Sequence, residues 1–315
     1  MVNQDSDNFC IFSGTSHPEL ASEIASSLEV PLGKINITRF PDGEISVQIL
    51  ENVRGRDVFI VQTIAMKPNE YLMELLIIMD ALRRASVKSI NAVIPYYGYC
   101  RQDRKDKPRV PITAKLVANM LASAGATRII TMDLHAGQLQ GFFDIPVDNL
   151  FARPLMVETV QSLGISDLMV VVPDIGSVKL GRSYANHLGV DMAIVNKNRI
   201  NATETEVISL IGNVKGKNIL LADDMCSTAS TLVSAAKACL KEGALKVFAS
   251  ITHGLLVGDA LAKIEASPIE LVLLSNTVPQ PKNLPAKFRL VSVASHLVHA
   301  IRCTLSKESI SSLYN

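Results

Sequence analysis

Residues 219–232, ILLADDMCSTASTL, place two adjacent carboxylates in front of a turn that is rich in hydroxyl groups. The apolar run 219–222 predicts a buried parallel strand, and apolar residues at helical spacing from Leu232 onward predict a helix. Open α/β sheets bind ligands at the carboxyl ends of their strands, and the following helix N-terminus favours a phosphate. The segment therefore indicates a sugar-phosphate site, although the same pattern also describes an ordinary N-capped helix with acids at its start.

The side chains of this segment divide between the two parts of a sugar phosphate. Asp223 and Asp224 would repel a phosphate, so we expect them to accept hydrogen bonds from vicinal sugar hydroxyls. The phosphate suits the hydroxyl and backbone N–H groups of the turn, which contains Ser227, Thr228, Ala229, Ser230 and Thr231. Cys226 has no histidine partner nearby in the sequence, which favours a small buried side chain over a nucleophile.

A second anion-binding loop is predicted at residues 172–182, VPDIGSVKLGR, between another apolar strand and a helix. Asp174 offers oxygen ligands that suit Mg²⁺, directly or through water, while Gly176 and Ser177 complete the turn. An ordinary strand-to-helix turn also fits this pattern when it is taken alone.

Two loops in the first half of the chain carry candidate nucleotide contacts. Arg101 and Gln102 lie closest to the strand end in PYYGYCRQDRKDKPR, residues 95–109, whereas most other charges of that run suit a solvated loop. His135 follows a strand that ends near Asp133. Because Mg²⁺ prefers oxygen, His135 suits a nucleotide phosphate or a metal-bound water as well as the metal, and a structural histidine is the common alternative.

Residues 196–207, NKNRINATETEV, are polar and lack periodicity, which predicts a flap after a strand. Lys197 and Arg199 at its base are placed to offset charge that develops on transferring phosphoryl oxygens. No catalytic base or covalent nucleophile is evident, and phosphoryl transfer by positioning and electrostatics requires neither. The sequence contains neither GxxxxGK(S/T) nor GxGxxG, which argues against a P-loop kinase and a dinucleotide enzyme.

Strand-like and helical segments alternate along nearly the whole chain, which predicts an α/β fold with mainly parallel sheets flanked by helices. A chain of 315 residues favours two domains of roughly 150 residues each. Segments 125–135 and 243–253 are similar at an offset of 118 residues, which indicates a duplicated unit and domains 1–149 and 150–315. The tail 295–314 is predicted to be helical, and the sequence leaves open which domain it packs against.

Composition restricts the partners and the compartment. Thirty-one Lys plus Arg face thirty Asp plus Glu, and the net charge of +1 argues against recruitment by nucleic acid or an anionic membrane surface. Five scattered cysteines without a CxxC pair suit a reduced, cytoplasmic protein. No apolar run approaches the roughly 20 residues that span a bilayer, so membrane insertion is not expected.

Five segments in the same order resemble signatures of the ribose-phosphate pyrophosphokinases, the synthetases of phosphoribosyl pyrophosphate, along essentially the whole chain. They are FPDGE at 40–44, YCRQDRK at 99–105, PITAKLVANML at 111–121, DLHAGQLQGFFDIPVDNL at 133–150 and DDM at 223–225. The resemblance implies two phosphoribosyltransferase-like domains and a Mg²⁺-dependent transfer of the diphosphoryl group of ATP to the anomeric hydroxyl of ribose 5-phosphate, releasing AMP. It also implies a homo-oligomer, a hexamer built from dimers.

The same resemblance assigns roles by position. It implies that Asp223 and Asp224 hold the ribose hydroxyls and that residues 227–231 hold the 5-phosphate. It implies that ATP contacts Arg101, Gln102 and His135, joined by Phe40, Asp42 and Glu44 from a neighbouring subunit. It implies a diphosphate loop of Asp174, Gly176 and Ser177, Mg²⁺ ligation by His135 and Asp174 with Asp133 in support, and a catalytic flexible loop with Lys197 and Arg199. Asp144 and Asp148 belong to the same signature but lie farther along their loop.

Departures from the family pattern occur in the ribose-phosphate loop, in the diphosphate loop and in the flap, where Asn198 stands in place of a common charged residue. Ser227, Ala229 and Ser230 stand where the ribose-phosphate loop usually has a third Asp and a Gly pair, and Ser177 replaces a Gly. Side chains at those places restrict positive φ angles. A catalytically silent regulatory subunit is therefore the alternative to an active enzyme, although it would not need the retained cations and aspartates together. A phosphoribosyltransferase fits residues 219–232 alone and leaves FPDGE and RQDRK unexplained.

Overall fold

The computed structural model describes residues 8–198 and 207–311. The chain divides into two compact units, and the first unit is formed by three separate segments of the chain. Unit 1 contains Met1–Phe151, Thr277–Pro279 and Val293–Asn315, and unit 2 contains Ala152–Asn276 and Gln280–Ser292. The sequence proposed a single boundary after residue 149 and left open whether the tail helix packs on the first domain.

Unit 1 is built on a parallel sheet. Its described strands lie in the order β1 (Phe9–Ser13), β4 (Asp57–Val61), β5 (Ser89–Ile94), β6 (Arg128–Met132) and β7 (Val147–Leu150). All four pairings are parallel. Most strand residues are buried, as expected for a sheet that helices cover on both faces.

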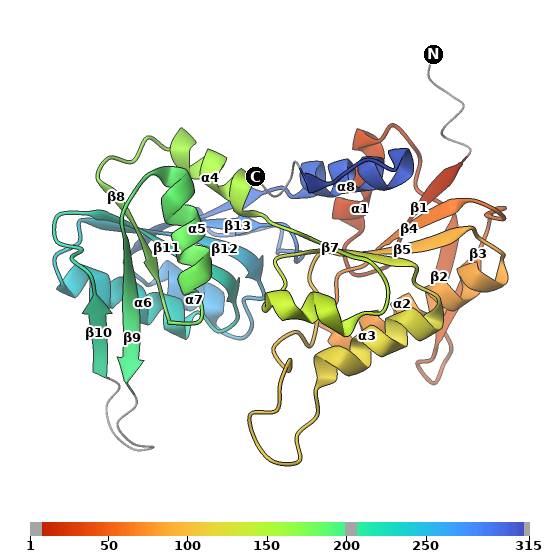
Figure 1. The fold of residues 1–315 in the computed structure, drawn as a ribbon, viewed down its shortest axis with the longest axis horizontal. Helices are drawn as coiled ribbons and strands as arrows, with labels where there is room; N and C mark the ends of the chain where they lie inside the picture. Colours follow the sequence, from red (N-terminus) through yellow and green to blue (C-terminus); the bar gives the residue numbers. More distant parts are fainter. Residues whose placement is uncertain (1–7, 199–206, 312–315) are drawn as a thin grey trace. The chain divides into compact units, whose positions relative to one another are not determined.

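Four helices cover this sheet, as Figure 1 shows. α1 (Pro18–Ser27) and α8 (Ala294–Ser306) lie on one face, and α2 (Pro68–Arg84) and α3 (Thr113–Ala124) lie on the other. The Arg302 guanidinium donates a 3.0 Å hydrogen bond to the Ser27 carbonyl, so the tail helix packs on unit 1. α8 ends at Ser306, earlier than the helix expected to Tyr314, because Lys307 takes a left-handed conformation with φ 60°.

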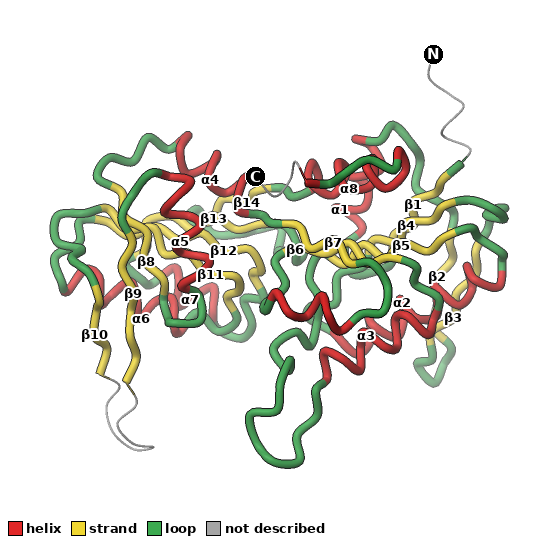
Figure 2. Tube along the Cα trace, viewed as in Figure 1, coloured by secondary structure: helices red, strands yellow, loops and turns green. Residues whose placement is uncertain are grey.

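A hairpin that the sequence analysis did not predict joins α1 to β4. Its strands, β2 (Ile35–Arg39) and β3 (Ile45–Ile49), pair antiparallel as a separate two-stranded sheet. A short 3-10 helix, η1 (Gly137–Phe142), follows β6. The segment between β5 and α3 is a long loop, drawn green in Figure 2.

Unit 2 contains the larger described sheet. Its order is β10 (Val207–Ile211), β9 (Met192–Asn198), β8 (Leu168–Val172), β11 (Asn218–Cys226), β12 (Lys246–Gly254), β13 (Ile269–Ser275) and β14 (Phe288–Val291). Only the β9–β10 pair among these is antiparallel. The helices are α4 (Arg153–Ser162), α5 (Val178–Leu188), α6 (Ser230–Lys241) and α7 (Ala260–Glu265).

Side chains of unit 2 alternate between two cores. Met169 and Val171 belong to the apolar cluster that contains α6 residues such as Leu232 and Ala236. Val172 points the other way, where α5 approaches so closely that a side chain on Gly181 would lie 2.3 Å from it. The predicted α/β class, with mainly parallel sheets flanked by helices, is confirmed. No helix in the described ranges is long and apolar enough to cross a membrane.

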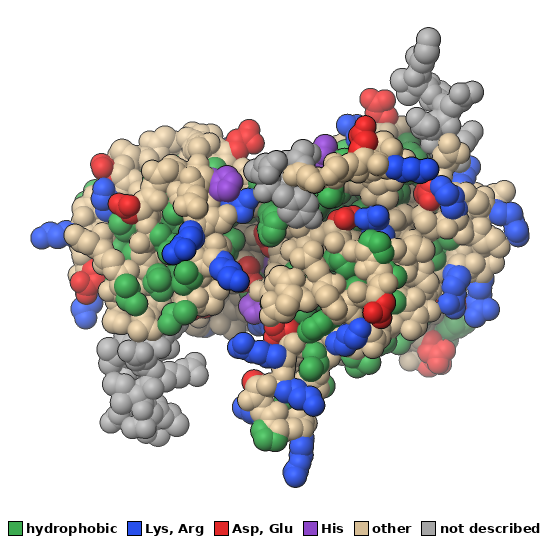
Figure 3. All heavy atoms as spheres, viewed as in Figure 1, with side chains coloured by type: hydrophobic (Ala, Val, Ile, Leu, Met, Phe, Trp, Pro, Cys, Tyr) green, Lys and Arg blue, Asp and Glu red, His purple; other side chains and the backbone are tan. Residues whose placement is uncertain are grey.

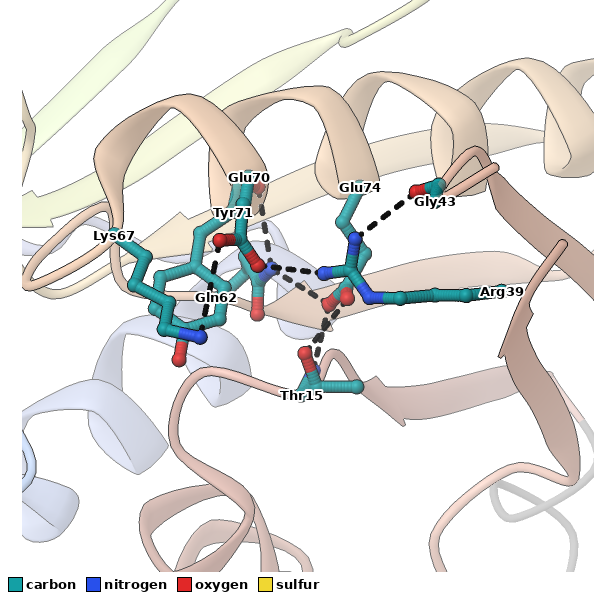
Figure 4. Close-up of polar contacts among 8 residues, drawn as sticks. All are labelled: Thr15, Arg39, Gly43, Gln62, Lys67, Glu70, Tyr71 and Glu74. Carbon is teal, nitrogen blue, oxygen red and sulfur yellow. Dashed lines mark hydrogen bonds and ion pairs between the residues drawn. The ribbon is translucent and has the colours of Figure 1, made fainter. Parts of the chain in front are cut away.

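A buried carboxylate connects α2 to the loop after β1 and to the end of β4 in unit 1. Glu74 of α2 is only 2% exposed, and it accepts hydrogen bonds from the Thr15 backbone N–H (2.7 Å), the Thr15 hydroxyl (2.6 Å) and the Gln62 amide (2.8 Å), as Figure 4 shows. The side-chain amide oxygen of Gln62, Oε1, accepts a 3.1 Å bond from the Ser16 N–H. A side chain on Gly14 would lie 2.2 Å from that oxygen, which explains the glycine there. The network fixes the loop after β1 against α2 and β4.

Truncating Glu74 should therefore destabilise unit 1. We expect Glu74→Ala to lower the free energy of unfolding by about 3 kcal/mol, because it removes the acceptor of three hydrogen bonds, one of them from the buried Gln62 side chain. Asp80→Ala is the control, since Asp80 is an exposed carboxylate on the same helix that pairs with Arg83 and Arg84, and it should cost much less. Urea unfolding followed by circular dichroism measures both, and equal losses would contradict the role assigned to Glu74.

Candidate functional site

The two carboxylates of unit 2 lie inside β11. The sequence predicted that the strand ends at Ala222, but β11 continues to Cys226. Its pairing with β8 stops at Leu221, whereas its pairing with β12 continues to the Cys226–Gly254 pair. β11 therefore extends beyond β8 along β12, and the space beside Asp223 is left to the loop that follows β8.

Ser177 in that loop connects two aspartates. Its hydroxyl lies 2.9 Å from Asp223 Oδ1 and 3.3 Å from Asp174 Oδ1, and its backbone N–H donates to Asp174 Oδ1 at 3.0 Å. Because a serine hydroxyl has one proton, it donates to only one carboxylate at a time. Asp223 Oδ1 also accepts a 3.0 Å bond from the Asp224 N–H. The structure thus brings together two loops that the sequence treated as separate anion sites.

Three carboxyl groups are concentrated at this point. Burial, together with the nearby carboxylates of Asp224 and Asp174, raises the pKa of Asp223 to about 8, against the lowering effect of the Ser177 hydrogen bond. Asp174, in contrast, is exposed. A site of this kind favours cations and hydroxyl donors.

Cys226 is buried at the end of β11. Burial, with Asp223 nearby, raises the pKa of its thiol to about 12, so the thiolate needed for nucleophilic attack is scarce. This agrees with the expectation that Cys226 packs and does not react.

The hydroxyl-rich turn follows Cys226 and begins α6. Ala229 is the residue before the helix and takes the left-handed conformation, with φ 61°, at a cost of about 1 kcal/mol for a residue with a side chain. No side chain caps the first turn of α6, and the Thr228 and Ser230 side chains are exposed. The Ser227 carbonyl accepts a 2.9 Å bond from the Val257 N–H, which ties the turn to the loop after β12. With Thr231 half-buried in the first turn, the segment presents N–H and hydroxyl donors as an anion site requires.

Unit 1 contains a pocket of about 580 Å³ beside its long loop. Its lining residues are Arg101, Gln102, Asp103, Arg104, Asp106, Lys107, Val110, Pro111 and His135. The structure thus brings together Arg101, Gln102 and His135. Gln102 is fixed by a short hydrogen bond from the Thr113 hydroxyl and by a 3.1 Å bond from the Ala114 N–H to its carbonyl.

Asp133 stands apart from this pocket wall. It is 7% exposed and has φ 39°, and its backbone N–H donates a 2.8 Å bond to the Leu150 carbonyl. His135, two residues later, is exposed. No three His, Cys, Asp or Glu side chains within 8–198 and 207–311 gather as a ready metal site.

The remaining predicted residues lie on the hairpin and the flap. Phe40, Asp42 and Glu44 are exposed at the tip between β2 and β3. Lys197 lies in β9, where its backbone pairs with Ile208 of β10. Arg199 lies outside the described residues.

Comparison with known proteins gives consistent matches. Residues 9–125 match a family model described as the N-terminal domain of ribose phosphate pyrophosphokinase, and residues 197–315 match one described as a phosphoribosyl synthetase-associated domain. A ribose-phosphate pyrophosphokinase of Wolinella succinogenes is 50% identical over 304 residues, covering 96% of this chain and 98% of that protein. One of Clostridium perfringens is 50% identical over 317 residues, covering 99% of each.

A solved structure is also similar along nearly the whole chain. The phosphoribosylpyrophosphate synthetase of Mycobacterium smegmatis superposes with a TM-score of 0.90 at 38% identity, covering 95% of this chain and 99% of that one.

Removing the Ser177 hydroxyl should change the ionisation of Asp223. The hydrogen bond lowers the pKa of Asp223, so in Ser177→Ala we expect that pKa to rise above about 8. Ser177→Thr keeps a hydroxyl and is the control. Carbon-13 NMR titration of the carboxyl groups in metal-free buffer measures the pKa, and an unchanged or lower value in Ser177→Ala would contradict the bridge.

The raised pKa also fixes the sign of a pH effect on stability. The folded protein binds the Asp223 proton more tightly than the unfolded chain, so the metal-free protein should lose stability as the pH rises from the ordinary carboxyl value of 3.8 to about 8, with no further loss from this group at higher pH. Asp223→Asn should lose that part of the pH dependence. Thermal melts of both proteins across this range test it, and parallel curves would count against it.

Proposed function

The chain belongs to the ribose-phosphate pyrophosphokinase family, and from that membership we propose how its residues perform the family's reaction. The activity is that of a ribose-phosphate diphosphokinase of nucleotide biosynthesis. The anomeric oxygen of ribose 5-phosphate forms a bond to the β-phosphorus of ATP. The bond between that phosphorus and the oxygen bridging to the α-phosphorus breaks, AMP leaves with the bridging oxygen, and the hydroxyl proton is released.

The observation that carries the assignment of the sugar site is the Ser177 bridge to Asp223. It fixes Asp223 Oδ1 through the 2.9 Å bond from Ser177 and the 3.0 Å bond from the Asp224 N–H, which leaves Oδ2 to accept a ribose hydroxyl. Asp224 accepts the neighbouring hydroxyl in this proposal. The uncapped N-terminus of α6, with Ser227–Thr231 around it, binds the 5-phosphate.

The pocket of unit 1 is the proposed ATP site. Arg101 contributes a guanidinium and Gln102 an amide held by α3, while His135 closes the wall with an exposed imidazole. Lysine and arginine side chains surround the loop, as the blue spheres in Figure 3 show. Such cations suit a triphosphate.

The hairpin tip completes the ATP site from a neighbouring subunit in this proposal. Phe40 is 53% exposed, which is unusual for a large aromatic side chain and is consistent with burial in an oligomer. Asp42 and Glu44 flank it. We therefore propose a homo-oligomer, and the family favours a hexamer of dimers.

Mg²⁺ is the proposed cofactor. Asp174 is exposed and offers carboxylate oxygens, which suits an ion that keeps water and substrate oxygens in its coordination shell. This also fits the lack of a ready three-residue metal group in the described ranges. In unit 1, His135 is the candidate contact for Mg²⁺ or a metal-bound water, and Asp133 supports its loop from a buried position. In unit 2, Gly176 leaves room for the diphosphate. The bound ion neutralises charge on the diphosphoryl oxygens.

Lys197, which lies in β9, and Arg199, which lies outside the described residues, are the proposed transition-state cations. A cytoplasmic location is part of the proposal, since the five cysteines, all within the described residues, are buried and form no disulfide.

An assay with ATP, Mg²⁺ and ribose 5-phosphate tests the function. We expect AMP release that depends on the sugar, stops with EDTA and returns with Mg²⁺. Asp224→Ala should lower kcat/KM for the sugar by about 100-fold, because it removes a hydrogen bond to a charged acceptor that orients the ribose. Asp259→Ala, which removes an exposed carboxylate paired with Lys263 in the same unit, should have no effect. Absence of AMP would favour the silent regulatory subunit.

The flap cations have a separate test. Lys197→Ala should lower kcat by about two orders of magnitude or more with little change in KM, because charge stabilisation is lost mainly in the transition state. Lys246→Ala, at the exposed start of β12, is the matched control. Undiminished turnover of Lys197→Ala would remove the flap from the mechanism.

A further inference from the structure

We propose that Arg39 and Glu70 are positioning residues that hold the hairpin tip, Phe40–Glu44, in the shape that meets the nucleotide. The inference rests on the proposed role of the tip in ATP binding. Neither Arg39 nor Glu70 was singled out in the sequence, because they lie 31 residues apart and only the fold brings them together.

The tip is a closed turn that lacks packing of its own. The Phe40 N–H donates to the Glu44 carbonyl at 2.9 Å, and the Gly43 N–H donates to the Phe40 carbonyl at 2.9 Å. Gly43 has φ 95°, and a side chain there would meet open space. Glycine is therefore favoured by the backbone conformation of the turn and not by lack of room. The Glu44 N–H donates to the Asp42 carboxylate at 3.2 Å. These bonds define the turn internally but do not fix it relative to unit 1.

Arg39 supplies the external attachment. One guanidinium nitrogen, Nη1, donates to the Gly43 carbonyl at 3.2 Å, and the other, Nη2, donates to Glu70 at 2.6 Å. Figure 4 shows the side chain lying between the tip and α2, with one nitrogen directed to each. A planar guanidinium can span two acceptors in this way, whereas a lysine ammonium is a point donor.

Glu70 connects Arg39 to α2, one of the helices that cover the sheet. It lies in the first turn of α2, where a carboxylate also interacts favourably with the helix dipole. The Lys67 ammonium nitrogen lies 3.7 Å from Glu70 Oε1. Glu74 is one helical turn farther along and is fixed by Thr15 and Gln62. Gln62, directly after β4, is therefore connected through Glu74 to α2, and α2 is connected through Glu70 and Arg39 to the tip.

Because the Arg39–Glu70 ion pair is partly exposed, its role in positioning the tip can be tested apart from the stability of the fold. The side chains of Arg39 and Glu70 are 47% and 41% exposed, and ion pairs of that kind contribute little to the free energy of folding. Loss of the pair should leave the fold intact and release the tip. The effect should then be on the binding of ATP, with a smaller effect on turnover.

The test compares Arg39→Gln and Glu70→Gln with Arg83→Gln. Arg83 is a matched control, because it is also a half-exposed arginine that joins a carboxylate of α2, Asp80, to a backbone carbonyl, that of Ser123. We expect the first two variants to raise the KM for ATP by about tenfold with less than a twofold change in kcat and an unchanged melting temperature. Arg39→Lys should resemble Arg39→Gln, and Arg83→Gln should resemble the parent.

Hydrogen exchange separates this inference from the proposed function. The amide hydrogens of Phe40 and Gly43 should exchange several-fold faster in Arg39→Gln and Glu70→Gln than in the parent protein, in the absence of any substrate. If the parent released no AMP, the proposed function would fail while the exchange rates still tested the attachment. Unchanged exchange rates, or an unchanged KM in an active Arg39→Gln enzyme, would overturn the inference.

Discussion

Burial of both sheets by helices on both faces is the constraint on which the rest of this protein depends. Within such a sheet a carboxylate has neither water nor enough donors, so charged side chains are restricted to the ends of strands. In β11, Ile219–Ala222 are fully buried, and the first carboxylate appears where pairing with β8 has ended. Even there the cost is visible, because burial raises the pKa of Asp223 to about 8.

The two units use buried or half-buried carboxylates in opposite ways. Glu74 in unit 1 accepts three protein hydrogen bonds and fixes a loop to a helix. Asp223 in unit 2 accepts bonds at Oδ1 and lies beside other carboxylates. The first arrangement is a satisfied structural network, whereas the second keeps repulsion that a cation or a hydroxyl donor relieves. This contrast is a physical reason for placing the ligand chemistry of the sugar at Asp223.

The turn before α6 forms although Ala229 and Ser230 stand where the family usually has a pair of glycines. Ala229 adopts φ 61° although it has a side chain, and the surrounding contacts hold it there. Ser177 likewise gives its loop a hydroxyl, and that hydroxyl reaches Asp223. The departures from the family pattern that suggested a silent subunit are therefore compatible with the local geometry that a sugar-phosphate site needs.

The sequence by itself determined the fold class, the family and the local order of strand, carboxylates and turn, because these depend on hydrophobic periodicity and on residues that are neighbours in the chain. It did not predict the β2–β3 hairpin, the extension of β11 to Cys226 or the packing of α8 on α1. Tertiary structure alone decided that Ser177 meets Asp223 and that Arg39 meets Glu70. Such contacts join residues far apart in sequence, and their geometry depends on strand register and helix packing, which no local pattern encodes.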